Sequence, residues 1–331
     1  MSVARALIVM VGLAWVAAAS PFDLQGHRGA RGLEPENTLH AFARALSIGV
    51  TTLELDVGVT ADDVLVVTHD RRLNPDHTRD ACGREPTPPT PAIRSLTLKQ
   101  LRMYEVGIAR SGGETRRAFP RQRQRANARI PTLDEVFEFV GRHDTDVRFN
   151  IETKLSPLAP DETASPQTFA RLLVESIRRA GLVHRASVQS FDWRTLALVR
   201  ALAPDITVVH LSSQQKGFDT LEAGKPHASP WTNGNDIDNY EGSAPKLVAA
   251  MGGTVWAPNA LDATPRRIGE AKALGLKVIV WTVNEPDDMA RLIDLGVDGL
   301  ITDYPNRLRR VMASRAMPLP RAVAVFPLSI N

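Results

Sequence analysis

Residues 187–210 read SVQSFDWRTLALVRALAPDITVVH and contain one full unit of the predicted fold. The short apolar runs Ser187–Ser190 and Ile206–His210 predict two strands, and the amphipathic segment Trp193–Ala201 between them predicts a helix. A strand, a helix and a second strand in this order are typical of a parallel βαβ unit. The stretch therefore indicates a parallel sheet that is covered by helices.

The same alternation continues toward both ends of the chain. Six further strands are predicted at Asp23–His27, Thr52–Val57, Arg148–Thr153, Thr254–Ala257, Lys277–Trp281 and Gly299–Thr302, and further helices at Asn37–Ile48, Leu133–Arg142, Thr168–Ala180, Pro265–Leu274 and Asp287–Leu295. Eight strands that alternate with helices favour an α/β fold of the closed (β/α)8 TIM-barrel type. An open dinucleotide-binding sheet would carry a characteristic glycine-rich turn after its first strand, and residues 26–32 lack that spacing.

Two stretches interrupt the alternation. Residues 70–131 lie between the second and third strands and are rich in Pro and Arg, so we interpret them as a small insertion with loops. A short extra strand is possible just before them, at Val64–His69. The second stretch, Ser212–Tyr240, is rich in Gly, Asn, Asp and Pro and follows the fifth strand. Because loops after barrel strands lie on the catalytic face, this stretch should cover the mouth of the barrel.

Charge and cysteine content narrow the functional classes. Lys and Arg number 40 and Asp and Glu number 37, so the formal net charge is only +3. That balance gives no indication of nucleic-acid binding and suits a small anionic substrate. Cys82 is the only cysteine, which excludes an internal disulfide and a cysteine-based metal cluster.

The first residues, MSVARALIVMVGLAWVAAAS, have the pattern of a secretory signal peptide over residues 1–19. The apolar run Ala6–Val16 is shorter than the about 20 residues that a membrane-spanning helix needs. We therefore expect cleavage near Ser20 and no stable membrane insertion afterwards, with an uncleaved anchor as the alternative. The expected product is a periplasmic or secreted protein with a barrel domain over residues 20–313 and a C-terminal tail, 314–331, of unknown role.

Acidic side chains occur near the ends of the second and third predicted strands. Glu54 and Asp56 are two residues apart and therefore share one face of their strand, and Glu152 lies on the next strand. Like charges are costly to bury together, and a divalent cation such as Ca²⁺ or Mg²⁺ would resolve that conflict through carboxylate oxygens. The alternatives are a polar strand face that meets solvent and, for Glu152, a simple ion pair with Lys154.

Two histidines and two basic residues complete the candidate site. His27 and Arg28 follow the first strand between glycines, and His69 ends an apolar run. Histidines at such positions are candidates for general acid and base, and Arg28 and Lys154 are candidates for phosphate binding. An exposed His-Arg turn and a structural role for His69 are the competing interpretations. Trp281, at the end of the seventh strand, is either a substrate contact or a core aromatic.

Several short motifs occur in one order along residues 23–312: GHRG (26–29), EPENT (34–38), ELDV (54–57), VVTHD (66–70), IPTL (130–133), NIETK (150–154), VQSFD (188–192), WTVN (281–284) and GVDGLITDYP (296–305). Together they resemble the glycerophosphodiester phosphodiesterase family, and the long stretch Ser212–Tyr240 resembles its larger exported members. Each motif alone is weak, whereas the ordered set is specific.

The resemblance implies a (β/α)8 barrel with a small insertion, and hydrolysis of glycerophosphodiesters to glycerol 3-phosphate and an alcohol. The family's general acid–base histidines match His27 and His69. Its divalent-metal ligands match Glu54, Asp56 and Glu152, and the metal is Ca²⁺ or Mg²⁺. The expected substrate-binding residues are Arg28, Lys154, Gln189 and Trp281.

Two other functions remain open from the sequence. A phospholipase D-like enzyme acting on lysophospholipids or sphingolipids would use the same metal and histidines but would need an apolar groove. The polar composition of Ser212–Tyr240 favours a small water-soluble phosphodiester instead. A non-catalytic phosphodiester-binding protein would be expected to lack a histidine or a carboxylate of the set, and none is missing.

Overall fold

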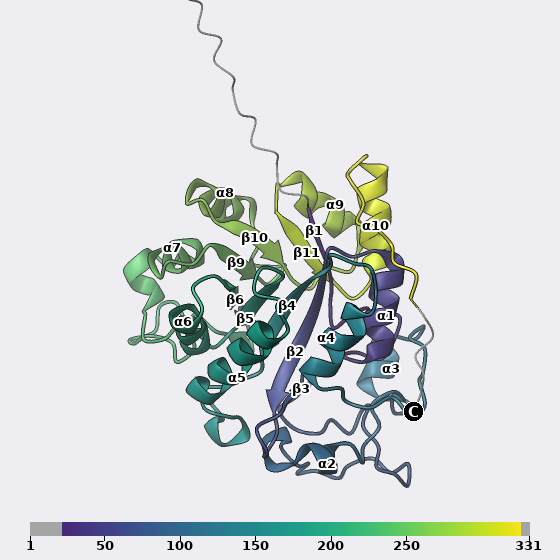
Figure 1. Ribbon diagram of the computed structural model, residues 1–331. Helices are drawn as coiled ribbons and strands as arrows, with labels where there is room; N and C mark the ends of the chain where they lie inside the picture. Colours follow the sequence, from purple (N-terminus) through teal and green to yellow (C-terminus); the bar gives the residue numbers. More distant parts are fainter. Residues whose placement is uncertain (1–21, 326–331) are drawn as a thin grey trace, which may run out of the picture.

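The computed structural model describes residues 22–325, and its centre is a closed barrel of parallel strands (Figure 1). Around the barrel the strands are β1 (Asp23–Gly26), β2 (Thr52–Val59), β4 (Arg148–Thr153), β5 (Ala186–Ser190), β6 (Thr207–Ser212), β9 (Val255–Pro258), β10 (Lys277–Val280) and β11 (Gly299–Thr302). β11 pairs with β1 in parallel, from Asp23↔Gly299 to Gly26↔Thr302, and this pairing closes the barrel. The predicted TIM barrel is confirmed.

Helices cover the outside of the barrel (Figure 1). They are α1 (Leu39–Ile48), α4 (Leu133–Gly141), α5 (Pro166–Arg179), α6 (Trp193–Leu202), α7 (Ala244–Ala250), α8 (Pro265–Ala273), α9 (Pro286–Asp294) and α10 (Pro305–Ser314). Their apolar faces pack on the strands through fully buried side chains such as Phe42, Phe169 and Trp193. Neither α7 nor α10 was among the predicted helices, because α7 is only seven residues long and the sequence of α10 is rich in Arg.

The predicted insertion and its extra strand are also present. β3 (Leu65–Val67) pairs with the end of β2 in an antiparallel arrangement, which explains why β2 continues past the barrel to Val59. The short helices η1 (Ile93–Ser95), α2 (Leu98–Leu101) and α3 (Glu114–Ala118) follow within long loops. The insertion has a small apolar core of its own, formed by Val66, Leu73, Ile93, Leu101, Val106 and Ile130.

The loop after β6 covers the mouth of the barrel, as expected. It contains a short hairpin, β7 (Gln214–Gln215) with β8 (Phe218–Asp219), and the turn η3 (Ile237–Tyr240). The Gln214 backbone N–H donates to the Asp262 carboxylate, 2.8 Å away, and the Trp193 N–H donates to the Trp231 carbonyl, 2.9 Å away. These bonds fasten the loop to the segments that follow β9 and β5.

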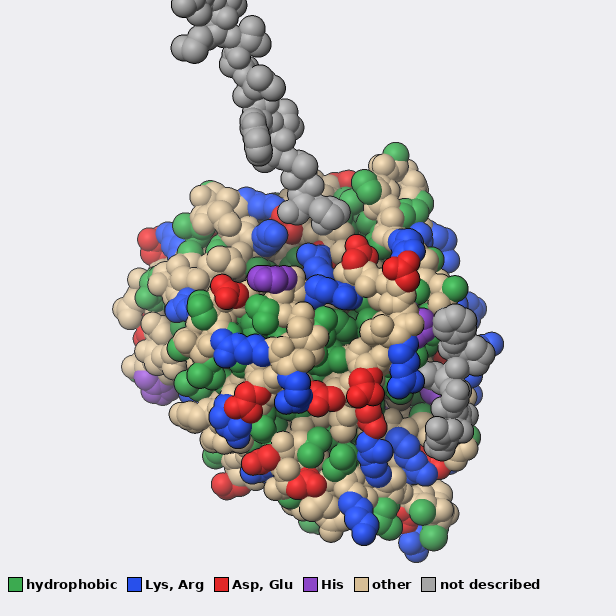
Figure 2. All heavy atoms as spheres, in the orientation of Figure 1, with side chains coloured by type: hydrophobic (Ala, Val, Ile, Leu, Met, Phe, Trp, Pro, Cys, Tyr) green, Lys and Arg blue, Asp and Glu red, His purple; other side chains and the backbone are tan. Residues whose placement is uncertain are grey.

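The predicted signal peptide, residues 1–19, lies outside the described residues, as do the last residues of the predicted tail. Among residues 22–325, no helix is long and apolar enough to span a bilayer. The described part of the tail returns along the outside of the barrel, where the Val323 N–H donates to the Leu46 carbonyl at 3.0 Å. Figure 2 shows basic and acidic side chains interspersed over the viewed face, in keeping with the nearly balanced charge.

Candidate active site

The three predicted metal ligands meet on two neighbouring strands. β2 and β4 are paired in parallel with Asp56 opposite Glu152, and Glu54 precedes them on the same face of β2. All three side chains are buried, and one carboxylate oxygen from each lies within 4.8 Å of the others. Three buried carboxylates at this separation form a group that could hold a metal ion.

Hydrogen bonds from the chain orient these carboxylates. The Arg28 backbone N–H and the Gln189 side-chain amide donate to the two oxygens of Glu54, at 2.7 and 2.8 Å. The Asn37 amide donates to Asp56 Oδ2 at 2.8 Å. Asp56 Oδ1 is buried and has no hydrogen-bond partner in the described part of the chain. A buried carboxylate oxygen without a hydrogen bond fits a place for a cation.

The pKa values of these carboxyl groups also favour a cation site. Burial raises the pKa of Glu54 well above its ordinary value, and the neighbouring charge of Asp56 raises it further. Burial also raises the pKa of Glu152 to about 7, although Lys154 opposes the shift. Burial and the neighbouring carboxylates thus disfavour the ionised forms of Glu54 and Glu152 when no ligand is bound. A hard divalent cation would supply compensating positive charge through oxygen ligands.

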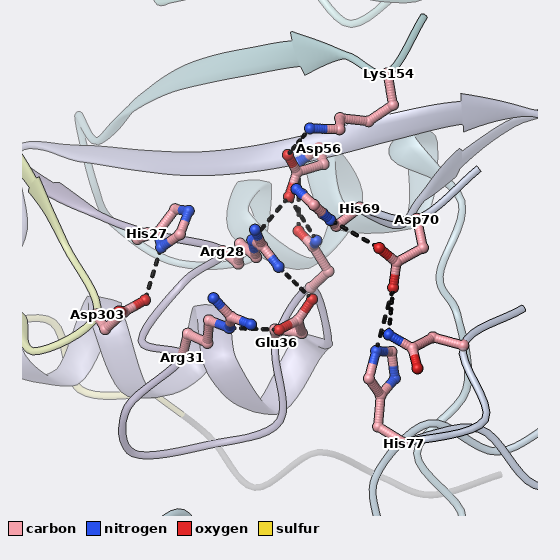
Figure 3. A network of polar contacts seen from close by, with 12 residues as sticks. His27, Arg28, Arg31, Glu36, Asp56, His69, Asp70, His77, Lys154 and Asp303 are labelled. Carbon is pink, nitrogen blue, oxygen red and sulfur yellow. Dashed lines mark hydrogen bonds and ion pairs between the residues drawn. The ribbon is translucent and has the colours of Figure 1, made fainter. Parts of the chain in front are cut away.

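Lys154 and Arg28 reach the same carboxylates. The Lys154 ammonium lies 2.6 Å from Glu152 Oε1 and 3.7 Å from Asp56 Oδ1, so the ion pair considered for Glu152 does form. The Arg28 guanidinium contacts Glu36 at 2.6 Å and Asp56 at 3.3 Å (Figure 3). Both cations line the cavity described below, where an anionic ligand would meet them.

A tight turn after β1 places Arg28. Arg28 has a φ of +48°, and Gly29 has a φ of +85°, a region in which glycine is unstrained. A Cβ atom at Gly26 would overlap the carbonyl oxygen of Gly29. The glycines therefore allow the chain to fold back so that the Arg28 N–H reaches Glu54.

The two predicted histidines each contact a carboxylate through Nδ1. His27 Nδ1 lies 2.6 Å from Asp303, and His69 Nδ1 lies 3.0 Å from Asp70 (Figure 3). Burial lowers the pKa of His27, although Asp303 opposes the shift. Burial lowers the pKa of His69 to about 4, and the positive charge of Arg28 adds to the shift. Both rings are therefore neutral at physiological pH in the protein without a ligand.

A cavity of about 670 Å³ connects all these groups. Its charged side contains both histidines, Glu54, Glu152, Arg28 and Lys154. Its other side is aromatic and is lined by Phe191, Phe218, Trp231 and Trp281. Trp281 packs edge to face on Phe191, which packs in turn on Phe218. A site with one ionic and one apolar side suits an amphiphilic anion.

The structure brings all nine predicted site residues to this cavity or, for Asp56, to the carboxylate group at its base. The side-chain amide of Gln189 is engaged by Glu54 and Asn150. Sequence reasoning did not assign site positions to Arg31, Glu36, Asn37, Asp70, Asn284, Asp303, Phe191, Phe218 and Trp231. Several of them lie inside the motifs EPENT, VVTHD, WTVN and GVDGLITDYP. Those motifs were the signal from which these residues could have been found.

Comparisons with known proteins show the family of the chain. The model of the Glycerophosphoryl diester phosphodiesterase family matches residues 27–307. A glycerophosphodiester phosphodiesterase of Caldanaerobacter subterraneus is 31% identical over 283 residues, which cover 85% of this chain and 94% of the relative. A glycerophosphodiester phosphodiesterase of Bacillus subtilis is 27% identical and covers 86% of this chain and 84% of its own length.

Solved structures show the same fold. A crystal structure of a Silicibacter pomeroyi protein named after the same activity has a TM-score of 0.79 and 35% identity, covering 90% of this chain and 95% of its own. An Oleispira antarctica phosphodiesterase, solved in complex with its product sn-glycerol-3-phosphate, has a TM-score of 0.62 and 19% identity, with coverage of 87% and 96%. At that identity the second likeness concerns the fold alone.

Proposed function

This chain belongs to the glycerophosphoryl diester phosphodiesterase family, and from that premise we propose that it hydrolyses glycerophosphodiesters to glycerol 3-phosphate and an alcohol with the aid of a divalent cation. One observation carries the proposal: a cluster of three buried carboxylates, two of which line the cavity, lies beside two histidines that each contact a further carboxylate. The match of nearly the whole chain to an enzyme family argues against a non-catalytic binding protein.

The proposed cation would be held by Glu54, Asp56 and Glu152. When bound, Ca²⁺ or Mg²⁺ would supply positive charge that polarises the phosphate and stabilises negative charge in the transition state. The oxygen ligands suit either ion. Arg28 and Lys154 line the same cavity and bind a non-bridging phosphate oxygen in this proposal, adding to that charge.

His27 and His69 perform the proton transfers. One ring takes a proton from the nucleophile, which is water or the glycerol 2-hydroxyl. Attack by the 2-hydroxyl forms a cyclic phosphate, which a water molecule then opens to glycerol 3-phosphate. The other ring must first take up a proton on Nε2, and it then gives that proton to the oxygen of the departing alcohol as its bond to phosphorus breaks. Because each Nδ1 faces a carboxylate, each ring has its Nε2 atom left for the substrate.

The direct test is incubation of the purified protein with glycerophosphocholine in the presence of Mg²⁺ or Ca²⁺. We expect release of glycerol 3-phosphate, which a coupled dehydrogenase assay measures. Exhaustive chelation should abolish the activity, and either ion should restore it. Full turnover by metal-free protein would contradict the cation role, and no product under any condition would contradict the proposed reaction.

A lysophospholipid is the second candidate substrate, and the aromatic side of the cavity favours it. The loop that was expected to be polar contributes Phe218 and Trp231 to that side, and Phe218 is 42% exposed. An apolar chain attached to the glycerol would contact these rings.

Paired kinetics with lysophosphatidylcholine and glycerophosphocholine separate the two substrates. If lysophospholipid is the better substrate, Phe218→Ala should lower kcat/KM for lysophosphatidylcholine at least about tenfold and leave that for glycerophosphocholine within about twofold. Leu261→Ala, which removes an exposed side chain outside the cavity lining, is the matched control. Equal losses on both substrates would favour the small phosphodiester alone.

The expected export of the chain stays a proposal. Mass spectrometry of the processed protein would show a mature N-terminus near Ser20, whereas an intact Met1 would contradict it.

A further inference from the structure

His27 is held by a carboxylate that is not among the predicted site residues. Asp303 follows β11, and its Oδ1 atom lies 2.6 Å from His27 Nδ1. We propose that Asp303 is a positioning residue that fixes the ring orientation and the tautomer of His27, and that Asn284 fixes Asp303 in turn. The inference rests on the proposed function, because His27 transfers a proton only in that reaction.

The backbone brings His27 and Asp303 together. β1 and β11 are paired with Gly26 opposite Thr302, so the next residue of each strand lies side by side. The His27 N–H donates to the Thr302 carbonyl at 2.9 Å, and the Gly32 N–H donates to the Asp303 carbonyl at the same distance. Both partners of the His27–Asp303 pair are therefore anchored through the main chain before their side chains meet.

The chemistry of the pair defines the tautomer of His27. Asp303 is buried, and burial raises the pKa of its carboxyl, but the contacts of its two oxygens with His27 at 2.6 Å and Asn284 at 2.7 Å favour the ionised form. An ionised carboxylate accepts hydrogen bonds and donates none, so His27 Nδ1 must carry the proton. The Nε2 atom of the neutral ring then keeps its lone pair, and Figure 3 shows this second nitrogen pointing away from Asp303.

Asn284 holds the carboxylate from the opposite side. The Asp303 backbone N–H and the Thr302 hydroxyl donate to Asn284 Oδ1, at 3.0 and 3.2 Å. A backbone N–H can only donate, so it assigns the oxygen of the Asn284 amide to that side. The amide nitrogen therefore faces Asp303 Oδ2, to which it donates at 2.7 Å. Both oxygens of Asp303 are thus engaged, one by His27 and one by Asn284.

The His69–Asp70 pair differs from the His27–Asp303 pair. Asp70 is the next residue in the chain, its side chain is 32% exposed, and it also accepts from Asn74 at 2.8 Å. Asp303 has a side-chain exposure of 5%. Both carboxylates are held at both oxygens, but Asp303 is the more buried and contacts no second histidine, so we expect its removal to act almost wholly on His27.

A double-mutant cycle tests whether Asp303 acts through His27. It uses the full chain with Mg²⁺ or Ca²⁺ and glycerophosphocholine as substrate. Asp303→Asn keeps the shape but presents an amide that can donate to Nδ1 and so favours the wrong tautomer. We expect Asp303→Asn to lower kcat at least about 10²-fold in the wild-type background, as expected for a histidine held in the wrong tautomer. In the His27→Ala background the same change should alter kcat by less than about threefold, because residues that act as a unit are not additive.

An equal fold-loss in both backgrounds, or a wild-type rate for Asp303→Asn, would overturn the proposal. The matched control is Asp192→Asn, a buried and ion-paired carboxylate that caps α6 outside the cavity lining. It should leave kcat within about twofold of wild type. Asn284→Ala keeps the His27–Asp303 pair and removes only its support, so a loss of about tenfold is expected.

Nitrogen-15 NMR of the imidazole rings gives a readout that is independent of turnover. In the wild-type protein at neutral pH, His27 should show the Nδ1–H tautomer, and in Asp303→Asn the Nε2–H tautomer. An Nε2–H tautomer in the wild type would overturn the proposal even if Asp303→Asn fails to fold. If no glycerophosphodiester is hydrolysed by the wild type, the proposed function fails, whereas the spectrum still decides whether Asp303 sets the state of His27.

Discussion

At the scale of single residues, the proposed chemistry depends on His27 and His69. Each general acid or base typically contributes about 10²–10⁴-fold in rate. We therefore expect His27→Ala and His69→Ala each to lower kcat for glycerophosphocholine at least about 10²-fold, with the thermal unfolding midpoint little changed because both rings line the cavity. Wild-type turnover by both variants would contradict the two-histidine mechanism.

The leaving group separates the two roles. A substrate that releases p-nitrophenolate barely needs a proton donor, since that anion is stable by itself. The variant that lacks the acid should recover much of its rate on such a substrate, and the variant that lacks the base should not. Steady-state kinetics of both variants on both substrates would therefore assign acid and base. Equal impairment on both substrates would leave the separate roles unsupported.

Residues that act through their neighbours are the hardest to predict from the sequence. Glu54 and Asp56 could be predicted as a pair because a two-residue spacing places them on one face of a strand. Asp303 lies 276 residues from His27, and only the closure of the barrel brings the two together. The sequence offered the motif GVDGLITDYP but no physical reason to select the second of its two aspartates.

At the scale of elements, the register between β2 and β4 brings the proposed metal ligands together. Glu54→Gln removes one anionic ligand, so we expect metal affinity to fall at least about tenfold, with a matching rise in the cation concentration that half-activates the enzyme. Titration of chelated protein with Mg²⁺ or Ca²⁺, followed by activity and by calorimetry, measures both. Glu138→Gln, on the exposed side of α4, is the control. Unchanged affinity for Glu54→Gln would remove Glu54 from the ligand set.

Some strands and loops could be predicted from the sequence better than others. Arg148–Thr153 and Gly299–Thr302 have the predicted bounds, because short apolar β-branched runs between polar turns identify barrel strands. The aromatic side of the cavity did not follow from sequence, because Phe218 and Trp231 lie in a loop without periodicity. Composition correctly described Ser212–Tyr240 as polar on average, but only tertiary packing decides which side chains of a loop turn inward.

At the scale of the whole molecule, buried ionisable groups make stability depend on pH in two opposing ways. Burial lowers the pKa of His210 to about 4, so the stability that its neutral form contributes is lost as pH falls from its unfolded value toward 4. The folded-state pKa values of Glu54 and Glu152 are raised, so their contribution has the opposite sign. In the metal-free protein the stability that these two glutamates contribute is present at low pH. It is lost as pH rises through about 7, the pKa of Glu152.

A bound cation should reverse the second effect and leave the first untouched. Metal binding requires ionised carboxylates, so protons compete with the cation below the raised pKa values of the glutamates. We expect the rise in unfolding midpoint on adding saturating Mg²⁺ or Ca²⁺ to be larger at about pH 8 than at about pH 5.5, by at least about 2 °C. Differential scanning fluorimetry of chelated and metal-loaded protein measures it, and subtraction cancels the contribution of His210. Glu152→Gln should reduce the pH dependence of the shift, because that variant lacks one of the two carboxyl groups whose protons the cation displaces. A shift of equal size at both pH values would mean that the cation, if it binds, does not displace protons from these carboxylates.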